Sequence, residues 1–179
     1  MTNHNNFIKL ANTITLLRIL LGLPISIALF LNNISLAWIL LVIGGLSDWL
    51  DGWIARKGKG GSKWGAQADP LADKIILLGP IIWLVQNGTI PLWSVWILIS
   101  REYIITAWRK TNKNGAPASQ YGKLKTLIQF VSILLLLFPD SLASNNYLII
   151  IKEIGLIGYW ISLFMAVYSS YKYINAQSV

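Results

Sequence analysis

The sequence contains no cysteine, one histidine and few charged residues. Asp, Glu, Lys and Arg make up 12% of its 179 residues, about half of the roughly 25% that is usual in a soluble domain. The absence of cysteine excludes disulfides, thiolate metal sites and cysteine nucleophiles. So little charge in a chain that is 55% hydrophobic also excludes a soluble secreted scaffold, a disordered chain and a coiled coil. An integral membrane protein is the class that remains.

Acidic residues are scarcer than basic ones. The chain has 7 Asp and Glu against 15 Lys and Arg, a formal net charge of +8. An excess of basic residues is typical of proteins that bind nucleic acid and of membrane proteins whose loops lie at the cytoplasmic face. Because this chain is so apolar, the second interpretation is favoured. We therefore expect the lipid bilayer, and no nucleic acid, as a partner.

Apolar residues are grouped into six segments, each near the length of about 20 residues that crosses a bilayer. The predicted spans are Thr13–Leu31, Ser35–Ala55, Pro70–Val85, Leu92–Trp108, Gly122–Phe138 and Tyr147–Tyr171. The predicted fold class is therefore an all-α integral membrane protein with six transmembrane helices, and residues 1–179 form a single domain.

Lys and Arg are concentrated in alternate connectors. The connectors Arg56–Asp69 and Arg109–Tyr121 are basic, whereas those at Asn32–Ile34, Gln86–Pro91 and Pro139–Asn146 contain no Lys or Arg. Because basic loops remain in the cytoplasm, both termini and both basic connectors are expected there. We expect no cleavable signal peptide, since the first residues are polar. The expected location is the inner membrane of a prokaryote.

Five of the acidic residues lie inside, or at the cytoplasmic end of, an apolar segment: Asp48, Asp51, Asp69, Asp73 and Glu102. Asp48 and Asp51 are three positions apart and Asp69 and Asp73 four, so each pair shares a helix face. A carboxylate in hydrocarbon costs roughly 2.5–3.5 kcal/mol, so these pairs need a compensating cation. That cation is either a Lys or Arg side chain or a divalent metal ion.

Oxygen ligands without histidine or cysteine suit Mg²⁺ or Mn²⁺. Four carboxylates balance two such ions in formal charge, and a two-metal site is typical of phosphoryl transfer. A structural alternative is open for each pair. Asp48 and Asp51 would then lie at a solvated helix end with Arg56 as counter-ion, and Asp69 would cap a helix that begins at Pro70.

The region around these carboxylates forms a motif of fixed spacing. It reads Asp48-Trp-Leu-Asp51-Gly52-Trp-Ile-Ala55-Arg56, then eight residues, then Gly65-Ala-Gln-Ala-Asp69-Pro-Leu-Ala-Asp73. This resembles the signature of the CDP-alcohol phosphatidyltransferase family, D-x2-D-G-x2-A-R-x8-G-x3-D-x3-D, at every defined position. The six predicted spans extend the resemblance over the whole chain.

The resemblance implies six transmembrane helices around a polar cavity that opens to the cytoplasm, usually in a homodimer. It implies displacement of CMP from a CDP-linked lipid by an alcohol, with two Mg²⁺ or Mn²⁺ ions. By motif position, the resemblance assigns the metal ligands to Asp48, Asp51, Asp69 and Asp73, the catalytic base to Asp73, and the CDP site to Gly52, Ala55, Arg56 and Gly65.

Basic residues outside the signature indicate the acceptor alcohol. We predict a second anion site that binds a phosphate on the acceptor, because Arg and Lys are both suited to phosphate. Its expected ligands are Arg18, Arg101, Arg109, Lys123 and Lys125. Two alternatives are open: an ion pair between Arg101 and Glu102, and plain membrane anchoring by Arg109, Lys123 and Lys125. Arg18 and Arg101 lie deep in their segments and should find buried partners.

Three short series in the chain are similar to members of the family that use glycerol 3-phosphate as acceptor and CDP-diacylglycerol as donor. They are Asn12-x2-Thr15-x2-Arg18, Ser100-Arg101-Glu102 and Gly122-Lys123-x-Lys125-Thr126. Ala107-Trp108-Arg109 departs from the Gly-Leu-Arg-like tripeptide expected there. Phosphatidylglycerol, serine or inositol phosphate are the alternative acceptors. Outside the enzymes, the alternative is a divalent-cation transporter that uses the same carboxylates.

Overall fold

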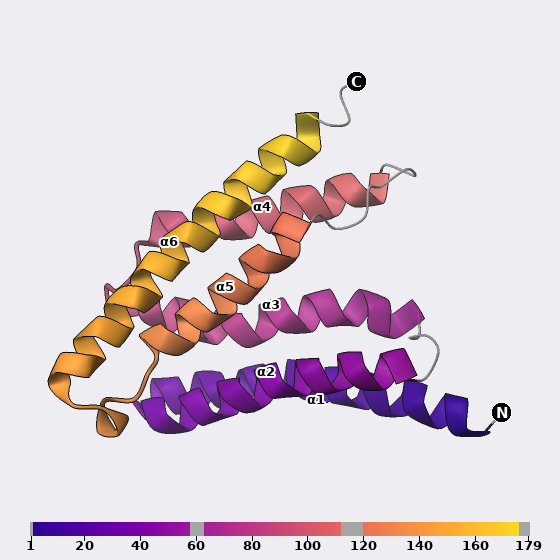
Figure 1. Cartoon of the computed structure of the whole chain (residues 1–179), viewed down its shortest axis with the longest axis horizontal. Coiled ribbons are helices and arrows are strands. Elements are labelled where there is room, and N and C mark those ends of the chain that lie inside the picture. The colour runs from indigo at the N-terminus through magenta and orange to yellow at the C-terminus, as the bar shows by residue number, and fades with distance from the viewer. Residues whose placement is uncertain (1, 58–62, 112–119, 176–179) are drawn as a thin grey trace. The chain divides into compact units, whose positions relative to one another are not determined.

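The computed structural model describes the backbone of residues 2–57, 63–111 and 120–175, and the side chains of residues 12–48, 68, 71–106 and 124–172. Within these residues every element of regular secondary structure is a helix (Figure 1). The helices are α1 (Thr2–Phe30), α2 (Ile34–Lys57), α3 (Lys63–Gln86), α4 (Leu92–Thr111), α5 (Gln120–Leu136), the short 3₁₀ helix η1 (Asp140–Leu142) and α6 (Asn145–Asn175). The all-α prediction is confirmed, and each predicted span overlaps one α-helix.

Two adjacent asparagines connect α1 to α2. Asn32 adopts φ 55°, and the N–H groups of Asn32 and Asn33 donate to the carbonyls of Leu29 (2.9 Å) and Ala28 (2.8 Å). This is a Schellman motif, in which Asn tolerates the left-handed conformation. The Asn33 side chain then accepts a hydrogen bond from the Leu36 N–H at 3.1 Å and caps α2. The connector is therefore short because both helix ends are satisfied locally.

The basic connectors are shorter than predicted. α2 continues to Lys57 and α3 begins at Lys63, while α4 continues to Thr111 and α5 begins at Gln120. Hydropathy marks only the apolar part of a helix, and polar residues can extend the helix beyond it. Because α3 begins at Lys63, the interpretation of Asp69 as an N-cap before Pro70 is wrong.

The helices belong to two compact units. The first contains residues Met1–Trp83 and Leu137–Leu142, and the second contains residues Leu84–Leu136 and Ala143–Val179. The first unit therefore includes α1, α2, most of α3 and η1, and the second includes α4, α5 and α6. The prediction of one domain over residues 1–179 stays a prediction.

Glycines allow close helix contacts in the first unit, where α1 packs along α2. A Cβ atom at Gly22 of α1 would lie 3.3 Å from the carbonyl oxygen of Ile75 in α3. Gly44 of α2 faces the side chain of Ile76, also in α3. Small residues let helix backbones approach in this way, so Gly44 is a packing position between α2 and α3.

In the second unit, α5 and α4 both pack against α6. A Cβ atom at Gly155 of α6 would lie 3.0 Å from the backbone nitrogen of Leu136 in α5. Ser94 of α4 and Tyr159 of α6 share a buried hydrogen bond of 2.8 Å between their hydroxyl oxygens. Backbone proximity thus holds α5 to α6, and a polar contact holds α4 to α6.

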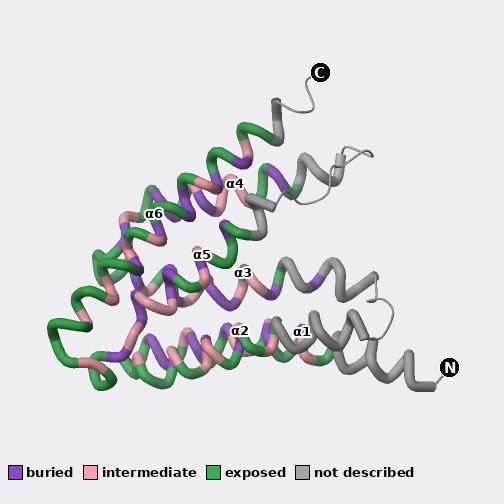
Figure 2. The backbone as a smooth tube through the Cα atoms, viewed as in Figure 1, coloured by how far each residue is buried: buried purple, intermediate pink, exposed green. Residues whose placement is uncertain are grey.

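Large apolar side chains are exposed on α1 and α6. Two helical segments among the described residues, Asn12–Phe30 and Asn145–Lys172, are long and apolar enough to cross a membrane. Leu23 and Phe164 are examples of exposed apolar side chains on them, and Figure 2 shows exposed residues along much of α6. Extended apolar surface is unfavourable in water. These two helices are compatible with a membrane protein.

We predict that Gly155→Val lowers the melting temperature by roughly 5–10 °C. The added carbons would meet the α5 backbone, and overpacking costs about 1–3 kcal/mol, each kcal/mol shifting the melting temperature by about 2–4 °C in a chain of this size. Tryptophan fluorescence of the detergent-solubilised protein during heating measures the change. Val131→Ile, which adds a methylene on an exposed side chain of α5, is the control and should leave the melting temperature unchanged. An unchanged melting temperature in Gly155→Val would contradict the close α5–α6 contact.

Candidate active site

Arg18 is a buried cation that joins three helices of the first unit. Its side chain is 1% exposed. Nη1 donates to Oδ1 of Asp48 on α2 at 2.7 Å and to Oδ1 of Asp73 on α3 at 3.3 Å. Nε also donates to Oγ of Ser47 at 3.4 Å. One guanidinium on α1 therefore contacts one carboxylate from each of the two acidic pairs.

The two carboxylates are accessible, although the arginine that they contact is not. The side chain of Asp48 is 51% exposed and that of Asp73 is 37% exposed. Ser47 is tied to its own helix, because its hydroxyl donates to the Gly44 carbonyl at 2.7 Å. A cation or a substrate group can therefore reach both carboxylates, while Arg18 lies beneath them.

The remaining residues of the signature have side chains outside the described part of the chain. Asp51, Gly52, Ala55 and Arg56 lie in α2, and Gly65 and Asp69 lie in α3. Among the side chains that the structure describes, no group of three or more His, Asp or Glu could hold a metal ion. The two described donors fit Mg²⁺ or Mn²⁺ in kind, because they are accessible carboxylate oxygens, the hard ligands that these ions prefer.

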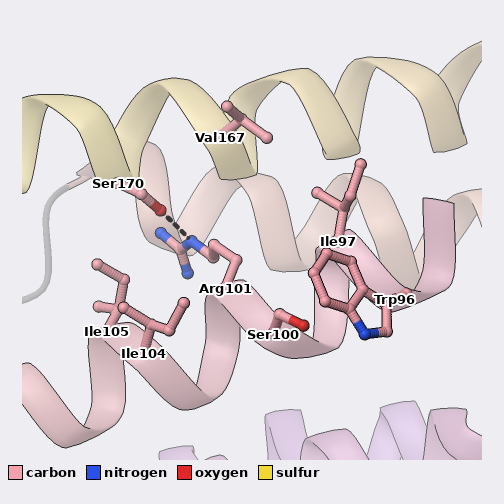
Figure 3. Close-up of a pocket in the computed structure, with 8 residues that line it drawn as sticks. All are labelled: Trp96, Ile97, Ser100, Arg101, Ile104, Ile105, Val167 and Ser170. Carbon is pink, nitrogen blue, oxygen red and sulfur yellow. Dashed lines mark hydrogen bonds between the residues drawn. The ribbon is translucent and has the colours of Figure 1, made fainter. Parts of the chain in front are cut away.

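A second group of charges lies in the second unit. Nη1 of Arg101 donates to Oε1 of Glu102 at 2.7 Å, and Nζ of Lys125 on α5 donates to the same oxygen. Nε of Arg101 donates to Oγ of Ser170 on α6 at 2.6 Å (Figure 3). It also donates to the carbonyl of Ala166, on the same helix, at 3.0 Å. All three charged side chains are largely buried. Two cations therefore contact one carboxylate where α4, α5 and α6 meet.

The expectation that Arg18 and Arg101 find buried partners is confirmed. The ion pair between Arg101 and Glu102, one of the two interpretations open from the sequence, is present. The side chains of Arg109 and Lys123 lie outside the described residues. Binding of an acceptor phosphate by Arg18, Arg101, Arg109, Lys123 and Lys125 stays a prediction.

Sequence reasoning did not identify the serines around the two arginines. Ser47 directly precedes Asp48, and Ser170 follows another serine that also accepts from Arg101, Ser169. Hydroxyl groups of this kind supply acceptors to a buried guanidinium. Two consecutive serines within the apolar segment Asn145–Lys172 are the signal that could have indicated this contact.

An open cavity of about 290 Å³ lies between α4 and α6 in the second unit. Its lining residues are Trp96, Ile97, Ser100, Arg101, Ile104, Ile105, Val167 and Ser170 (Figure 3). Most of these side chains are apolar, and the Arg101 guanidinium is turned toward Ser170 (Figure 3). Such a lining suits hydrocarbon better than a polar substrate.

The chain matches the model of one protein family, and the match includes the carboxylates of the site. The model of the CDP-alcohol phosphatidyltransferase family matches residues 8–168. The chain therefore belongs to the CDP-alcohol phosphatidyltransferase family, as its signature predicted. Arg18, Asp48, Asp73, Arg101 and Lys125 all lie within the matched residues.

Three relatives carry the name CDP-diacylglycerol–glycerol-3-phosphate 3-phosphatidyltransferase. The protein of Rickettsia typhi is 31% identical over 175 residues, which cover 94% of this chain and 96% of the relative. That of Bacillus subtilis is 33% identical over 143 residues, or 76% of this chain and 70% of the relative. That of Haemophilus influenzae is 32% identical over 163 residues, or 86% of this chain and 80% of the relative.

We predict that Glu102→Gln destabilises the protein by about 3 kcal/mol, because removal of one partner from a buried ion pair costs about 3–5 kcal/mol. Here the lost carboxylate contacts two cations. The free energy of unfolding in detergent measures the loss. Glu153→Gln, at an exposed position of α6, is the matched control and should change the stability by less than about 0.5 kcal/mol. Equal stabilities of the two variants would mean that Glu102 does not hold the cluster together.

Proposed function

We propose that this protein transfers the phosphatidyl group from CDP-diacylglycerol to glycerol 3-phosphate, which forms phosphatidylglycerophosphate and releases CMP. The observation that carries the proposal is the convergence of Asp48 and Asp73, from the two halves of the family signature, on one guanidinium. The names of the relatives, which align with up to 94% of the chain, support glycerol 3-phosphate as the acceptor.

In this proposal, Asp48, Asp51, Asp69 and Asp73 hold two Mg²⁺ or Mn²⁺ ions. When bound, these ions supply positive charge that stabilises the diphosphate and the leaving oxygen of CMP. The accessible carboxylates of Asp48 and Asp73 support the proposal, since their oxygens suit such ions. Gly52, Ala55, Arg56 and Gly65 form the CDP site, where the small residues Gly52, Ala55 and Gly65 leave room for the nucleotide.

Asp73 is the proposed general base. Its carboxylate takes the proton from the acceptor hydroxyl while the hydroxyl oxygen attacks the phosphorus of the lipid, and the bond from that phosphorus to CMP breaks. The side chain of Asp73 is 37% exposed and contacts Arg18. A partly exposed carboxylate that is held by a buried arginine is both accessible and oriented, and these are the geometric requirements for proton transfer.

Arg101, Arg109, Lys123 and Lys125 are proposed to bind the phosphate of glycerol 3-phosphate. The side chains of Arg101 and Lys125 are described by the structure, and they support this role because both contact the single carboxylate of Glu102. A cluster with such an excess attracts an anion. A phosphate that binds there has to compete with Glu102 for the two cations.

The proposed setting is a prokaryotic inner membrane. Six transmembrane helices surround a polar cavity that opens to the cytoplasm, both termini are cytoplasmic, and two copies form a homodimer. The exposed apolar side chains of α1 and α6 support the membrane setting. The concentration of Lys and Arg in alternate connectors supports the orientation.

The proposed reaction is tested by a radiolabel assay of the purified protein with CDP-diacylglycerol. Glycerol 3-phosphate, phosphatidylglycerol, serine and inositol phosphate are offered in turn, and labelled lipid is expected with glycerol 3-phosphate alone. EDTA should abolish CMP release, and Mg²⁺ or Mn²⁺ should restore it. Turnover with a different acceptor would overturn the choice of substrate, and full activity in EDTA would overturn the metal site.

We predict that Asp73→Asn lowers kcat about 10²- to 10⁴-fold, the usual contribution of a general base, with little change in the affinity for CDP-diacylglycerol. The amide retains an oxygen ligand but does not accept the proton. Single-turnover kinetics and binding of labelled CDP-diacylglycerol separate the two effects. Asp140→Asn, at an exposed carboxylate of η1, is the control and should retain full activity. A near-normal kcat in Asp73→Asn would assign the base to another residue.

A further inference from the structure

We infer that Arg18 is an internal counter-ion that competes with divalent cations for the carboxylates of Asp48 and Asp73. The inference rests on the proposed function in one respect, which is that these carboxylates bind metal. It gives Arg18 a positioning role instead of the acceptor-phosphate role that its place in the sequence predicts. The geometry points to this role because Arg18 contacts both carboxylates through the same nitrogen atom, Nη1.

A charge as deeply buried as that of Arg18 requires compensation within the protein. The side chain is 1% exposed and lies in the apolar segment Asn12–Phe30 of α1, where an uncompensated arginine is costly. Its described acceptors are the two carboxylates and the hydroxyl of Ser47. The carboxylates in turn repel each other unless a cation lies between them. Arg18 supplies such a cation, and it holds Asp48 of α2 close to Asp73 of α3.

The sign of the coupling between Arg18 and a metal ion follows from the charges. A divalent ion that binds Asp48 and Asp73 neutralises them, so their attraction for the guanidinium falls, and the ion itself repels the guanidinium. The contact with Arg18 is therefore weaker in the metal-bound state than in the metal-free state. Because coupling between two ligands of one site is reciprocal, Arg18 must weaken metal binding, and its removal must tighten it.

The two roles of Arg18 predict different measurements. A ligand of the acceptor phosphate affects the KM for glycerol 3-phosphate and leaves the affinity for metal unchanged. A counter-ion of Asp48 and Asp73 affects the affinity for metal and the stability of the metal-free protein, and leaves that KM unchanged. Binding of Mn²⁺ in the absence of either substrate therefore separates the roles without reference to turnover.

The experiment uses the full chain in lipid nanodiscs and measures Mn²⁺ binding by electron paramagnetic resonance. Arg18→Gln should bind Mn²⁺ on the order of tenfold more tightly than the unsubstituted protein, the effect of removing one charge near a divalent ion. In EDTA, Arg18→Gln should also melt at a lower temperature than the unsubstituted protein. Added Mn²⁺ should raise its melting temperature by more than it raises that of the unsubstituted protein. Arg18→Lys should tighten Mn²⁺ binding by a smaller factor, because it retains the charge but lacks the Nε–H that donates to Ser47 and fixes the guanidinium.

Lys172→Gln, at an exposed position near the end of α6, removes the same charge elsewhere and should bind Mn²⁺ like the unsubstituted protein. Unchanged or weaker Mn²⁺ binding in Arg18→Gln overturns the inference. If Arg18→Gln does not fold, unchanged or weaker Mn²⁺ binding in Arg18→Lys overturns it instead. A raised KM for glycerol 3-phosphate with unchanged Mn²⁺ binding also overturns it. If the unsubstituted protein binds Mn²⁺ but releases no CMP, the proposed function fails. The inference is then decided by the Mn²⁺ affinities of the Arg18 variants. No Mn²⁺ binding by the unsubstituted protein overturns both the metal site and the inference.

Discussion

The first unit of this protein depends on one requirement, the compensation of a buried guanidinium. Arg18 lies in an apolar segment of α1 and is 1% exposed, so its charge must be matched inside the protein. Asp48 of α2 and Asp73 of α3 supply the match. Gly22 and Gly44 make it possible, because each lets its helix come close to α3. Helix packing and charge compensation are thus two aspects of one arrangement, and both bring the carboxylates of the family signature together.

The second unit also contains buried positive charge, and it compensates that charge with a single carboxylate. Arg101 and Lys125 are also largely buried, but one carboxylate, that of Glu102, contacts both. Serine hydroxyls and a backbone carbonyl of α6 supply the other acceptors of Arg101. In the first unit the carboxylates outnumber the described cation that they contact, which suits metal ions. Among the described side chains of the second unit, two cations contact one carboxylate, which suits a phosphate. This opposite balance of charge is the physical reason for which we propose a metal site in the first unit and an acceptor-phosphate site in the second.

The helices could be predicted from the sequence, but their ends could not. Hydropathy placed each span on one α-helix, because the length of an apolar run sets what can cross a bilayer. It placed Asp69 and Pro70 at a helix start, whereas α3 begins at Lys63, since the polar residues that extend a helix into water leave no hydropathy signal. The end of α1 depends on Asn32 at φ 55° and on two backbone hydrogen bonds, a local geometry that hydropathy does not record.

The sequence by itself determined the family, the pairing of carboxylates on helix faces and the need for cations beside them, because motif spacing and helical periodicity are properties of the chain alone. It left open which cation each carboxylate contacts. Only the tertiary structure decided that Arg18 contacts Asp48 and Asp73, and that Arg101 shares Glu102 with Lys125. These partners are 30, 55 and 23 positions apart in the chain. Contacts at that separation depend on how helices pack, and helix packing depends on side chains of several segments together.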